Sequence, residues 1–233
     1  MLYNNLKFIF RHSIIFFFVS LIGMTLHEFV RKTKAKSLGY ESVYGPSCLG
    51  QLVFASEKMQ AAFQPIHQEN LEAIRSNLPF KDEDKWKKLV NQDKKDHALI
   101  ELSGFIFTIS ISLAGLILLF ARRKYQKKTN FTFIDWLGVY LSLFIMKELI
   151  TSLSWITLGF MPCEHAKFYQ YFHLPIREYD WIILSFCLFI VLFTIIMFVP
   201  KRRIIPFLIA GLTGGSSGII IWYFYFGKFV FQS

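Results

Sequence analysis

The fold is decided by residues 131–160, whose sequence is FTFIDWLGVYLSLFIMKELITSLSWITLGF. About 20 apolar residues in a helix, at 1.5 Å per residue, span the hydrocarbon of a bilayer. With Trp136 and Trp155 as interfacial anchors, Lys147 and Glu148 fall near the bilayer centre. Each such charge costs roughly 2.5 to 3.5 kcal/mol on insertion scales. The dipeptide is therefore expected to contact other helices, either as an ion pair that fixes packing or as a functional site.

The two charged residues need partners elsewhere in the chain. Neighbouring helical positions point about 100° apart, so we expect Lys147 and Glu148 not to pair with each other. Glu101 is the candidate partner of Lys147, and His27 or a hydroxyl group is the candidate partner of Glu148. Both residues are expected to face the helix bundle.

The composition is that of a membrane protein that crosses the bilayer several times. Of the 233 residues, 54% are hydrophobic and 27 are Phe, and the mean hydropathy is +0.40. Such values exclude a disordered chain and argue against an ordinary soluble domain. The net charge of +10 comes from basic runs beside apolar segments, which the positive-inside rule explains without nucleic acid. The expected partners are the lipid bilayer and other membrane protein subunits.

Hydropathy predicts five transmembrane helices in a single membrane domain, residues 1–233. They cover residues 8–30, 99–121, 136–160, 181–199 and 204–226. The first apolar run also suits a signal peptide, but no small-x-small cleavage site follows it, so a retained helix is expected. The predicted fold class is all-α, a polytopic membrane helix bundle.

A polar stretch, residues 31–98, separates the first two spans. Gly and Pro divide it into short pieces. Residues 52–63 and 66–78 predict brief amphipathic helices, and residues 82–97 predict a charged helix that leads into the second span. Because its apolar residues are too few for a separate core, this mostly helical cap is expected either to pack on the membrane helices or to lie at the membrane interface. The topology given below places it outside the cytoplasm.

Two short loops are strongly basic. Residues 122–128 hold five Lys or Arg residues, and residues 201–203 hold three. Placing both loops in the cytoplasm gives a cytoplasmic N terminus and an extracytoplasmic C terminus.

Small residues mark the last span as a packing surface. Gly211 and Gly215 stand four positions apart, as do Gly214 and Gly218. Glycines at this spacing share a helix face and let a neighbouring backbone approach closely. Because they lie within an apolar run, they predict a groove for another helix rather than a phosphate-binding loop.

His27 and Glu28 lie at the end of the first span, in the sequence LHEFVR. Membrane zinc proteases place two His ligands at positions i and i+4 of a helix, with the Glu after the first as general base. Here position i+4 is Arg31, whose guanidinium has no lone pair for a metal. The pair alone is a weak sign of a catalytic site.

Further short motifs surround this pair. They are AKSLGY at 35–40, LSGF at 102–105, DWL at 135–137, SLF at 142–144 before Lys147-Glu148, and AGLTGG at 210–215 before Trp222. Together with LHE they resemble segments of bacterial site-2-protease-like zinc metallopeptidases. The resemblance implies a membrane-embedded metallopeptidase fold in a bacterial cytoplasmic membrane, with His27 as a metal ligand and Glu28 as the base. The chain departs from that pattern at Arg31, at Phe105 in place of a proline, and in having no obvious Asp ligand inside a later span.

Other residues offer a way to rebuild a metal site. Cys163, Glu164 and His165 follow the third span and are expected on the same outer side as His27. They are suitable zinc ligands, although Cys-x-His is a weak spacing by itself. If the protein binds zinc, His27 and His165 are the candidate ligands.

The cysteines give a competing expectation. Cys48 and Cys163 fall on the outer side, whereas Cys187 lies within the fourth span in apolar surroundings. In an oxidising exterior, Cys48 and Cys163 either form a disulfide, if their Cα atoms come within about 4.4 to 6.8 Å, or remain unrelated thiols. A sulfur in that disulfide cannot serve as a zinc thiolate.

These features predict a metallopeptidase-like membrane protein without proteolytic activity and without a cofactor. We expect an accessory or structural subunit of a membrane complex. One alternative is an active intramembrane zinc metalloprotease with a non-standard ligand set and Glu28 as base. Another is a small transporter subunit that uses Lys147 and Glu148 as a coupling site.

Overall fold

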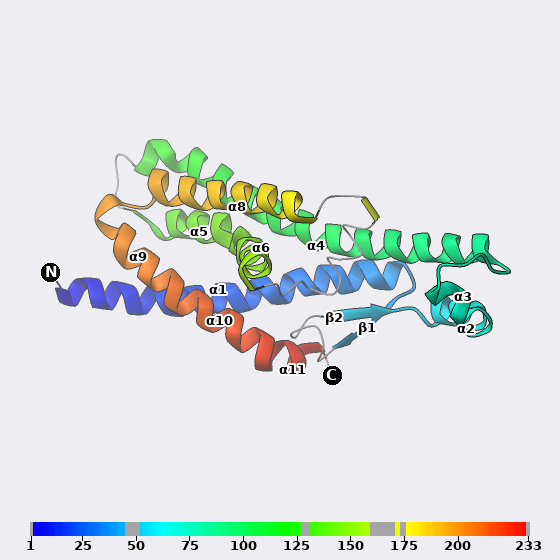
Figure 1. Ribbon diagram of the computed structural model, residues 1–233. Coiled ribbons are helices and arrows are strands. Elements are labelled where there is room, and N and C mark those ends of the chain that lie inside the picture. The colour runs from blue at the N-terminus through cyan, green and yellow to red at the C-terminus, as the bar shows by residue number, and fades with distance from the viewer. Residues whose placement is uncertain (1, 45–51, 127–130, 159–170, 173–175, 232–233) are drawn as a thin grey trace.

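The computed structural model describes residues 2–44, 52–126, 131–158, 171–172 and 176–231, which are mostly helical. Long helices lie side by side in one elongated bundle (Figure 1). Four helices in the described part of the chain are long and apolar enough to cross a membrane: Tyr3–Ser37, Glu83–Arg123, Trp181–Phe198 and Lys201–Phe231. At this level, the prediction of an all-α membrane protein is confirmed.

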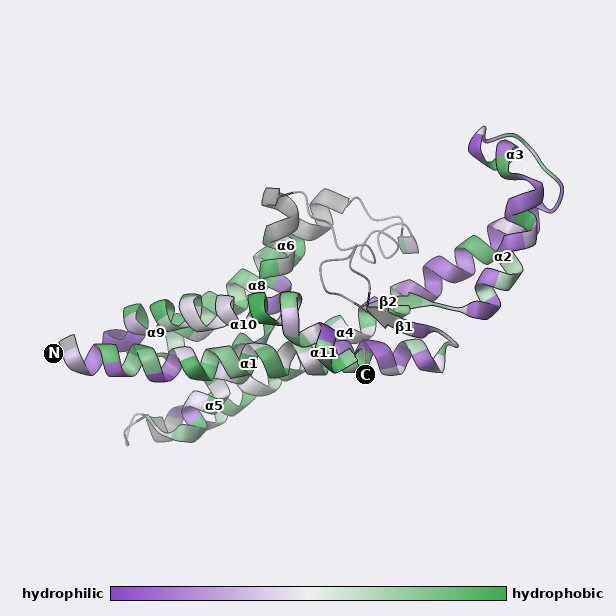
Figure 2. Cartoon of the chain, turned by 90° about the horizontal axis from the view of Figure 1, so that it is seen from below, coloured by the Kyte–Doolittle hydropathy of each residue, from purple (hydrophilic) through white to green (hydrophobic). Residues whose placement is uncertain are grey.

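The two longest helices are α1 (Leu2–Ser37) and α4 (Glu83–Gln126). Both exceed the roughly 20 residues that the hydrocarbon requires, so their ends extend beyond it. In α4 a charged first part runs without interruption into an apolar second part that begins near Ala98. The predicted charged helix and the predicted second span are therefore one rod. Hydrophilic residues gather at the end of the molecule that carries α2 and α3 (Figure 2).

The third apolar segment is broken into two helices. α5 (Phe133–Ser142) is followed by a 3-10 turn, η2 (Leu143–Ile145), and by α6 (Met146–Leu158). α6 runs across the direction of α5 and α1 (Figures 1 and 2). The expectation of one uninterrupted helix over 136–160 is wrong. Lys147 and Glu148 instead lie in the first turn of α6.

Close packing against α4 accounts for the position of the break. A Cβ atom on Gly115 would overlap the backbone nitrogen of Ser142, so α4 and the end of α5 are in backbone contact. The Ser142 hydroxyl also donates a hydrogen bond to the Val139 carbonyl at 2.9 Å. A side chain that bonds to the preceding turn favours a bend in the helix.

The main core lies between α1, α5, α8 (Ile176–Phe198) and the C-terminal helices. α8 packs on α5 and α6. Cys187 is fully buried on α8 among apolar residues. The core residues are Phe8, Phe16, Leu119, Val139, Tyr140, Leu143, Ile145, Cys187, Ile190, Val191, Ile195, Phe198, Val199, Phe207 and Ala210.

The C-terminal span is one helical run that contains two π-helical segments. Its parts are η3 (Lys201–Arg203), α9 (Ile204–Ala210), the π-helical η4 (Gly211–Gly215), α10 (Ser216–Ile221), the π-helical η5 (Trp222–Phe226) and α11 (Gly227–Phe231). A Cβ atom on Gly214 or Gly218 would collide with backbone carbonyl groups of α1. Gly211 and Gly215 meet only α1 side chains, at 3.4 Å or more. The glycine-lined groove therefore holds α1 of the same chain.

The described parts of the two basic loops, at the end of α4 and just before α9, lie at one end of the bundle together with the N-terminal end of α1 (Figure 1). Arg203 donates a hydrogen bond to Asn5 Oδ1 at 3.1 Å, and its guanidinium lies 4.7 Å from the centre of the Phe8 ring. Arg122 donates to Asp135 Oδ1 at 2.8 Å, which ties the start of α5 to the end of α4. α11 lies away from this end of the bundle and contacts β1 (Figure 1).

A β-hairpin that the sequence did not predict opens the polar segment. β1 (Glu41–Tyr44) and β2 (Leu52–Ala55) pair antiparallel, from Glu41 opposite Ala55 to Tyr44 opposite Leu52. α2 (Glu57–Glu69) and α3 (Leu71–Arg75) follow. The predicted helix over 52–63 is thus strand in its first part, and Pro65 lies inside α2 instead of ending a helix. Strands of four residues are too short to establish a two-residue period.

Tyr40 fastens the turn after α1 to α4. Its hydroxyl lies 3.2 Å from Asp93 Oδ1 and 3.4 Å from Asp96 Oδ2. Nearby, His97 Nε2 lies 3.2 Å from the Phe54 carbonyl oxygen and so links α4 to β2. Burial, and then the two carboxylates, raise the pKa of Tyr40 above its usual value near 10. The hydroxyl therefore stays protonated at neutral pH.

We expect Tyr40→Phe to lower the free energy of unfolding by about 1 kcal/mol near neutral pH through the lost hydrogen bond. Because folding raises the pKa of Tyr40, its contribution is complete below the unfolded pKa of about 10 and declines at higher pH. Thermal unfolding at about pH 8 and about pH 11 measures both effects. The wild type should lose more stability across that interval than the variant, and equal losses would contradict the prediction.

Candidate functional site

A buried group of polar side chains joins α1, α4 and α6. It combines three carboxylates, two cations, an imidazole and a hydroxyl. We define the polar cluster as His27, Glu28, Arg31, Glu101, Thr108, Lys147 and Glu148. Every member except Lys147 is at most 8% exposed, and the Lys147 side chain is 14% exposed. Buried polar and charged groups are stable only when they are paired.

Arg31 links two carboxylates from different helices. Its Nη1 atom donates to both carboxylate oxygens of Glu28, at 2.9 Å and 2.7 Å, one helical turn away on α1. Its Nη2 atom donates to Glu101 Oε1 on α4. Arg31 and Glu28 are each 2% exposed, so both charges are removed from solvent. A rigid guanidinium suits this arrangement because its N–H groups point in several fixed directions.

His27 lies between α4 and α6. Its Nδ1 atom is 3.0 Å from Thr108 Oγ1, and that hydroxyl donates to the Gly104 carbonyl at 3.0 Å. Since the hydroxyl proton is already used, we assign the proton of the imidazole to Nδ1. The lone pair on Nε2 then accepts a hydrogen bond from Lys147 Nζ at 2.5 Å.

Gly104 allows α1 to approach α4 at this point. A Cβ atom at residue 104 would lie 2.7 Å from His27 Cε1 and 2.9 Å from Arg31 Cγ. Both distances are shorter than ordinary van der Waals contacts, and both side chains are fixed by hydrogen bonds. The absence of a side chain at Gly104 is therefore a condition for the polar cluster.

We expect Gly104→Ala to lower stability by about 1 to 3 kcal/mol, because the added methyl group must displace His27 or Arg31. Gly39→Ala is not a suitable control, since Gly39 has a φ of +78° that only glycine adopts without strain. Ser103→Ala, one residue away on the same helix, is the better comparison. Thermal unfolding should separate the two variants, and equal midpoints would contradict this role of Gly104.

Lys147 and Glu148 do contact each other, contrary to the expectation from their adjacency. Lys147 Nζ lies 3.5 Å from Glu148 Oε1. The long, flexible lysine side chain reaches across the angle between neighbouring positions. Glu148 Oε1 also lies 3.7 Å from His27 Nδ1, which was its candidate partner. Glu101, the candidate partner of Lys147, accepts a hydrogen bond from Arg31.

Most of these contacts are ion pairs or charge-assisted hydrogen bonds, and Thr108 adds neutral hydrogen bonds to His27 and to the Gly104 carbonyl. Comparison of the chain with protein-family models, curated proteins and solved structures found no match. The chemistry of the polar cluster therefore follows only from the geometry of its own side chains.

The described residues around His27 do not fit a zinc ion. Zinc needs ligand lone pairs, but the Nε2 lone pair of His27 faces an ammonium group and both oxygens of Glu28 face a guanidinium. Among the residues that the structure describes, no three His, Cys, Asp or Glu side chains are grouped so that they could hold a metal ion. Cys163, Glu164 and His165 lie outside the described residues, as does Cys48. The second metal ligand and the disulfide stay predictions.

Sequence reasoning missed two contributors to the polar cluster. Thr108, which orients His27, was not considered, and Arg31 was interpreted only as a lost metal ligand. A helical projection would have revealed the first, because Glu101, Gly104 and Thr108 recur at positions that share one face of α4. The role of Arg31 would have been revealed by its position three residues after Glu28, a spacing at which opposite charges pair on a helix.

Proposed function

We propose that the chain is a non-catalytic integral membrane protein that serves as a structural or accessory subunit of a membrane complex. The observation that carries this proposal is the pairing of Glu28 with Arg31 through two hydrogen bonds, at 2.9 Å and 2.7 Å. A general base must reach the proton that it removes. In membrane zinc proteases, that proton belongs to a water molecule bound to the metal. The guanidinium of Arg31 occupies that side of the carboxylate.

The alternative role of the polar cluster is to fix the arrangement of three helices. Two of its contacts cross between helices in different places: Arg31 joins α1 to α4, and Lys147 joins α6 to α1. Ion pairs need particular distances and directions, whereas apolar packing tolerates sliding. The cluster therefore favours one position of the bent segment α5–α6 against α1 and α4.

The glycine pattern of the last span does not support a partner subunit. Gly214 and Gly218 contact α1 of the same chain, so they do not supply a free groove. The remaining support is the polar extension formed by α2, α3 and the charged part of α4 (Figure 2), together with the unsuitable metal site. Crosslinking in native membranes should add a second polypeptide to the chain. A chain that stays uncrosslinked and migrates as a monomer would contradict the subunit role.

Absence of zinc chemistry is tested directly on the purified full chain. We expect metal analysis to find no stoichiometric zinc, and we expect no cleavage of membrane peptides. Glu28→Gln should leave both results unchanged. About one zinc per chain, with cleavage that Glu28→Gln abolishes, would replace this proposal with the active metalloprotease.

We further propose that the basic end faces the bacterial cytoplasm and that α5 and α6 together form the third of five crossings. The shared position of the two basic loops supports this orientation. Reporter fusions after Lys128 and after Arg203 should both report a cytoplasmic location, and a C-terminal fusion should report an external one. Opposite locations for the first two fusions would contradict the five-crossing topology.

A further inference from the structure

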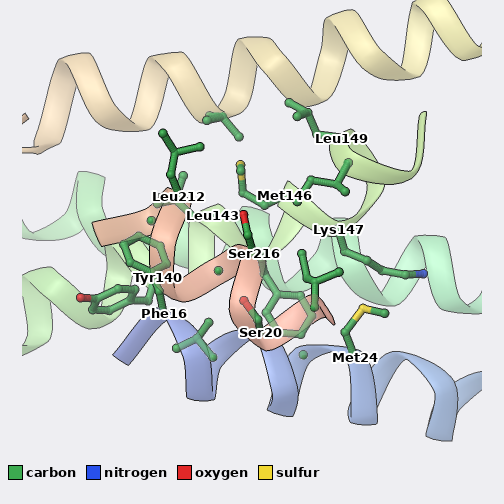
Figure 3. A pocket seen from close by; sticks show the side chains of 18 of the residues that line it. Phe16, Ser20, Met24, Tyr140, Leu143, Met146, Lys147, Leu149, Leu212 and Ser216 are labelled. Atoms are coloured by element: carbon green, nitrogen blue, oxygen red, sulfur yellow. The ribbon is translucent and has the colours of Figure 1, made fainter. Parts of the chain in front are cut away.

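An apolar pocket of about 450 Å³ lies beside the bend between α5 and α6 (Figure 3). Its walls come from α1, from the segment α5–η2–α6, from α8 and from the run α9–α10. The size falls within the range of pockets that hold small ligands or lipid chains, roughly 300 to 1,000 Å³. It shares only Lys147 with the polar cluster, and the inference drawn from it does not depend on the function proposed above.

The pocket lies at the depth of the hydrocarbon. α1 contributes residues from Phe16 to Met24, in the middle of its apolar part. At 1.5 Å per residue, this stretch covers about 12 Å of the helix. A water-soluble ligand would have to cross hydrocarbon to reach it, whereas a lipid chain is already at that depth.

The pocket is bordered by side chains that also face the lipid side of the bundle. Leu153 on α6, Leu212 on η4 and Ile220 on α10 line the pocket and are 45%, 68% and 54% exposed. A chain can therefore enter sideways from the bilayer between α6 and α10.

The charged residue in the lining does not offer its charge to the pocket. The methylene groups of Lys147 lie along the wall of the pocket. Its ammonium group points away from the other lining side chains (Figure 3). That ammonium is hydrogen-bonded to His27. The lining thus favours a hydrocarbon chain over a polar group.

Cationic side chains lie where the head group of such a lipid would be. Lys201 and Arg202 are exposed at the start of the helical run that forms one wall. Phe207, at the nearer end of the pocket, is five residues after Arg202, or roughly 8 Å along the helix. One leaflet supplies about 15 Å of hydrocarbon, so a chain anchored at Lys201 and Arg202 reaches the pocket. Exposed basic residues beside a membrane helix attract anionic lipid head groups.

We propose that this pocket holds one acyl chain of an anionic phospholipid from the leaflet at the basic end. The head group lies near Lys201 and Arg202, and the distal part of the chain fills the space between α1, α6, α8 and α10. The bend at η2 creates this space because α6 turns away from the direction of α5 (Figure 1).

Gly215 is the position at which to block the pocket. It lines the pocket, its φ and ψ of −63° and −49° are helical, and the nearest atom to an added Cβ is Ser20 Oγ at 3.8 Å. The Cβ of Gly215→Phe therefore has room, and we expect its ring to occupy pocket space beside Ser20. Ser216→Leu is a second, smaller block. Ile205→Phe is the matched control, because Ile205 is 70% exposed on the same helical run and does not line the pocket.

The experiment uses the full chain in phosphatidylethanolamine vesicles that contain phosphatidylglycerol with a photoactivatable diazirine on one acyl chain. After illumination, peptide mass spectrometry should find label at pocket residues such as Met24 and Leu149 in the wild type and in Ile205→Phe. Gly215→Phe and Ser216→Leu should lose this label. Replacing Lys201 and Arg202 together by Gln should remove the preference for phosphatidylglycerol over phosphatidylcholine.

Two results would overturn the proposal. One is labelling of exposed residues such as Phe10 and Ile117 as strong as that of the pocket, with no change in Gly215→Phe or Ser216→Leu. The other is pocket labelling by a diazirine fatty acid but not by the phospholipid, which would make the ligand a free fatty acid. Neither result bears on zinc content or cleavage, so a failure here is distinct from a failure of the proposed function.

Discussion

Arg31→Leu should lower the free energy of unfolding by about 3 to 5 kcal/mol, the usual cost of leaving buried charges without their partner. The substitution removes the guanidinium that binds both Glu28 and Glu101, and both carboxylates are buried. We expect little folded protein in the membrane, and a much lower unfolding temperature for what is recovered. Arg31→Lys should be intermediate, because one ammonium group cannot reproduce the directed hydrogen bonds of a guanidinium.

Lys36→Leu is the matched control for this experiment. Lys36 lies on the same helix and is exposed, so its loss should change stability by less than about 0.5 kcal/mol. A triple variant, Arg31→Leu with Glu28→Gln and Glu101→Gln, should regain part of the lost stability because no buried charge is left unpaired. If Arg31→Leu unfolds at the wild-type temperature, Arg31 does not hold the polar cluster together.

Gly214→Ala should strongly destabilise the protein whereas Gly215→Ala should not, although the two positions are neighbours in the sequence. A Cβ atom on Gly214 would overlap the carbonyl oxygen of Ser13, and a backbone group cannot move aside as a side chain can. We expect Gly214→Ala to cost about 3 kcal/mol or more by separating α1 from the C-terminal run. At Gly215 the added methyl group meets no clash, so Ala should be neutral or stabilising by up to about 1 kcal/mol through its higher helix propensity.

Thermal unfolding of the two glycine variants in one detergent provides the comparison. Both changes are Gly to Ala in the same helical run, so the change in helix propensity is the same for both. The difference in stability between the two variants therefore reports the contact with α1. Equal effects at the two positions would show that the approach of the helices is not limited by Gly214.

The helical class could be predicted from the sequence, but the bend of the third segment could not. Hydropathy averages over many residues and responds to the apolar character of residues 136–160, which a bent segment shares with a straight one. The bend depends on the contact of Gly115 with Ser142, two residues far apart in the sequence. The β-hairpin was missed for a related reason, because its strands of four residues are defined by their pairing with each other.

The candidate site could be predicted where burying a single charged residue costs so much free energy that a polar partner is required. Lys147 in an apolar segment requires a polar partner, and His27 was within the expected set for its neighbour Glu148. The role of Arg31 was not foreseen because comparison with a zinc motif asks only whether a ligand is present. The buried charge of Arg31 is explained by the two carboxylates that it neutralises, those of Glu28 and Glu101.

The unbroken length of α4 has a mechanical consequence. Its 44 residues form a rod of about 66 Å, roughly twice the thickness of the hydrocarbon. The outer part is attached to Tyr40 and Phe54 through Asp93 and His97, and the inner part carries Glu101 and Thr108. A rigid rod that passes through a fixed point acts as a lever. Tilting the outer end of α4 would therefore move Glu101 and Thr108 against Arg31 and His27, and so change the contacts that join α4 to α1 within the apolar part of the bundle.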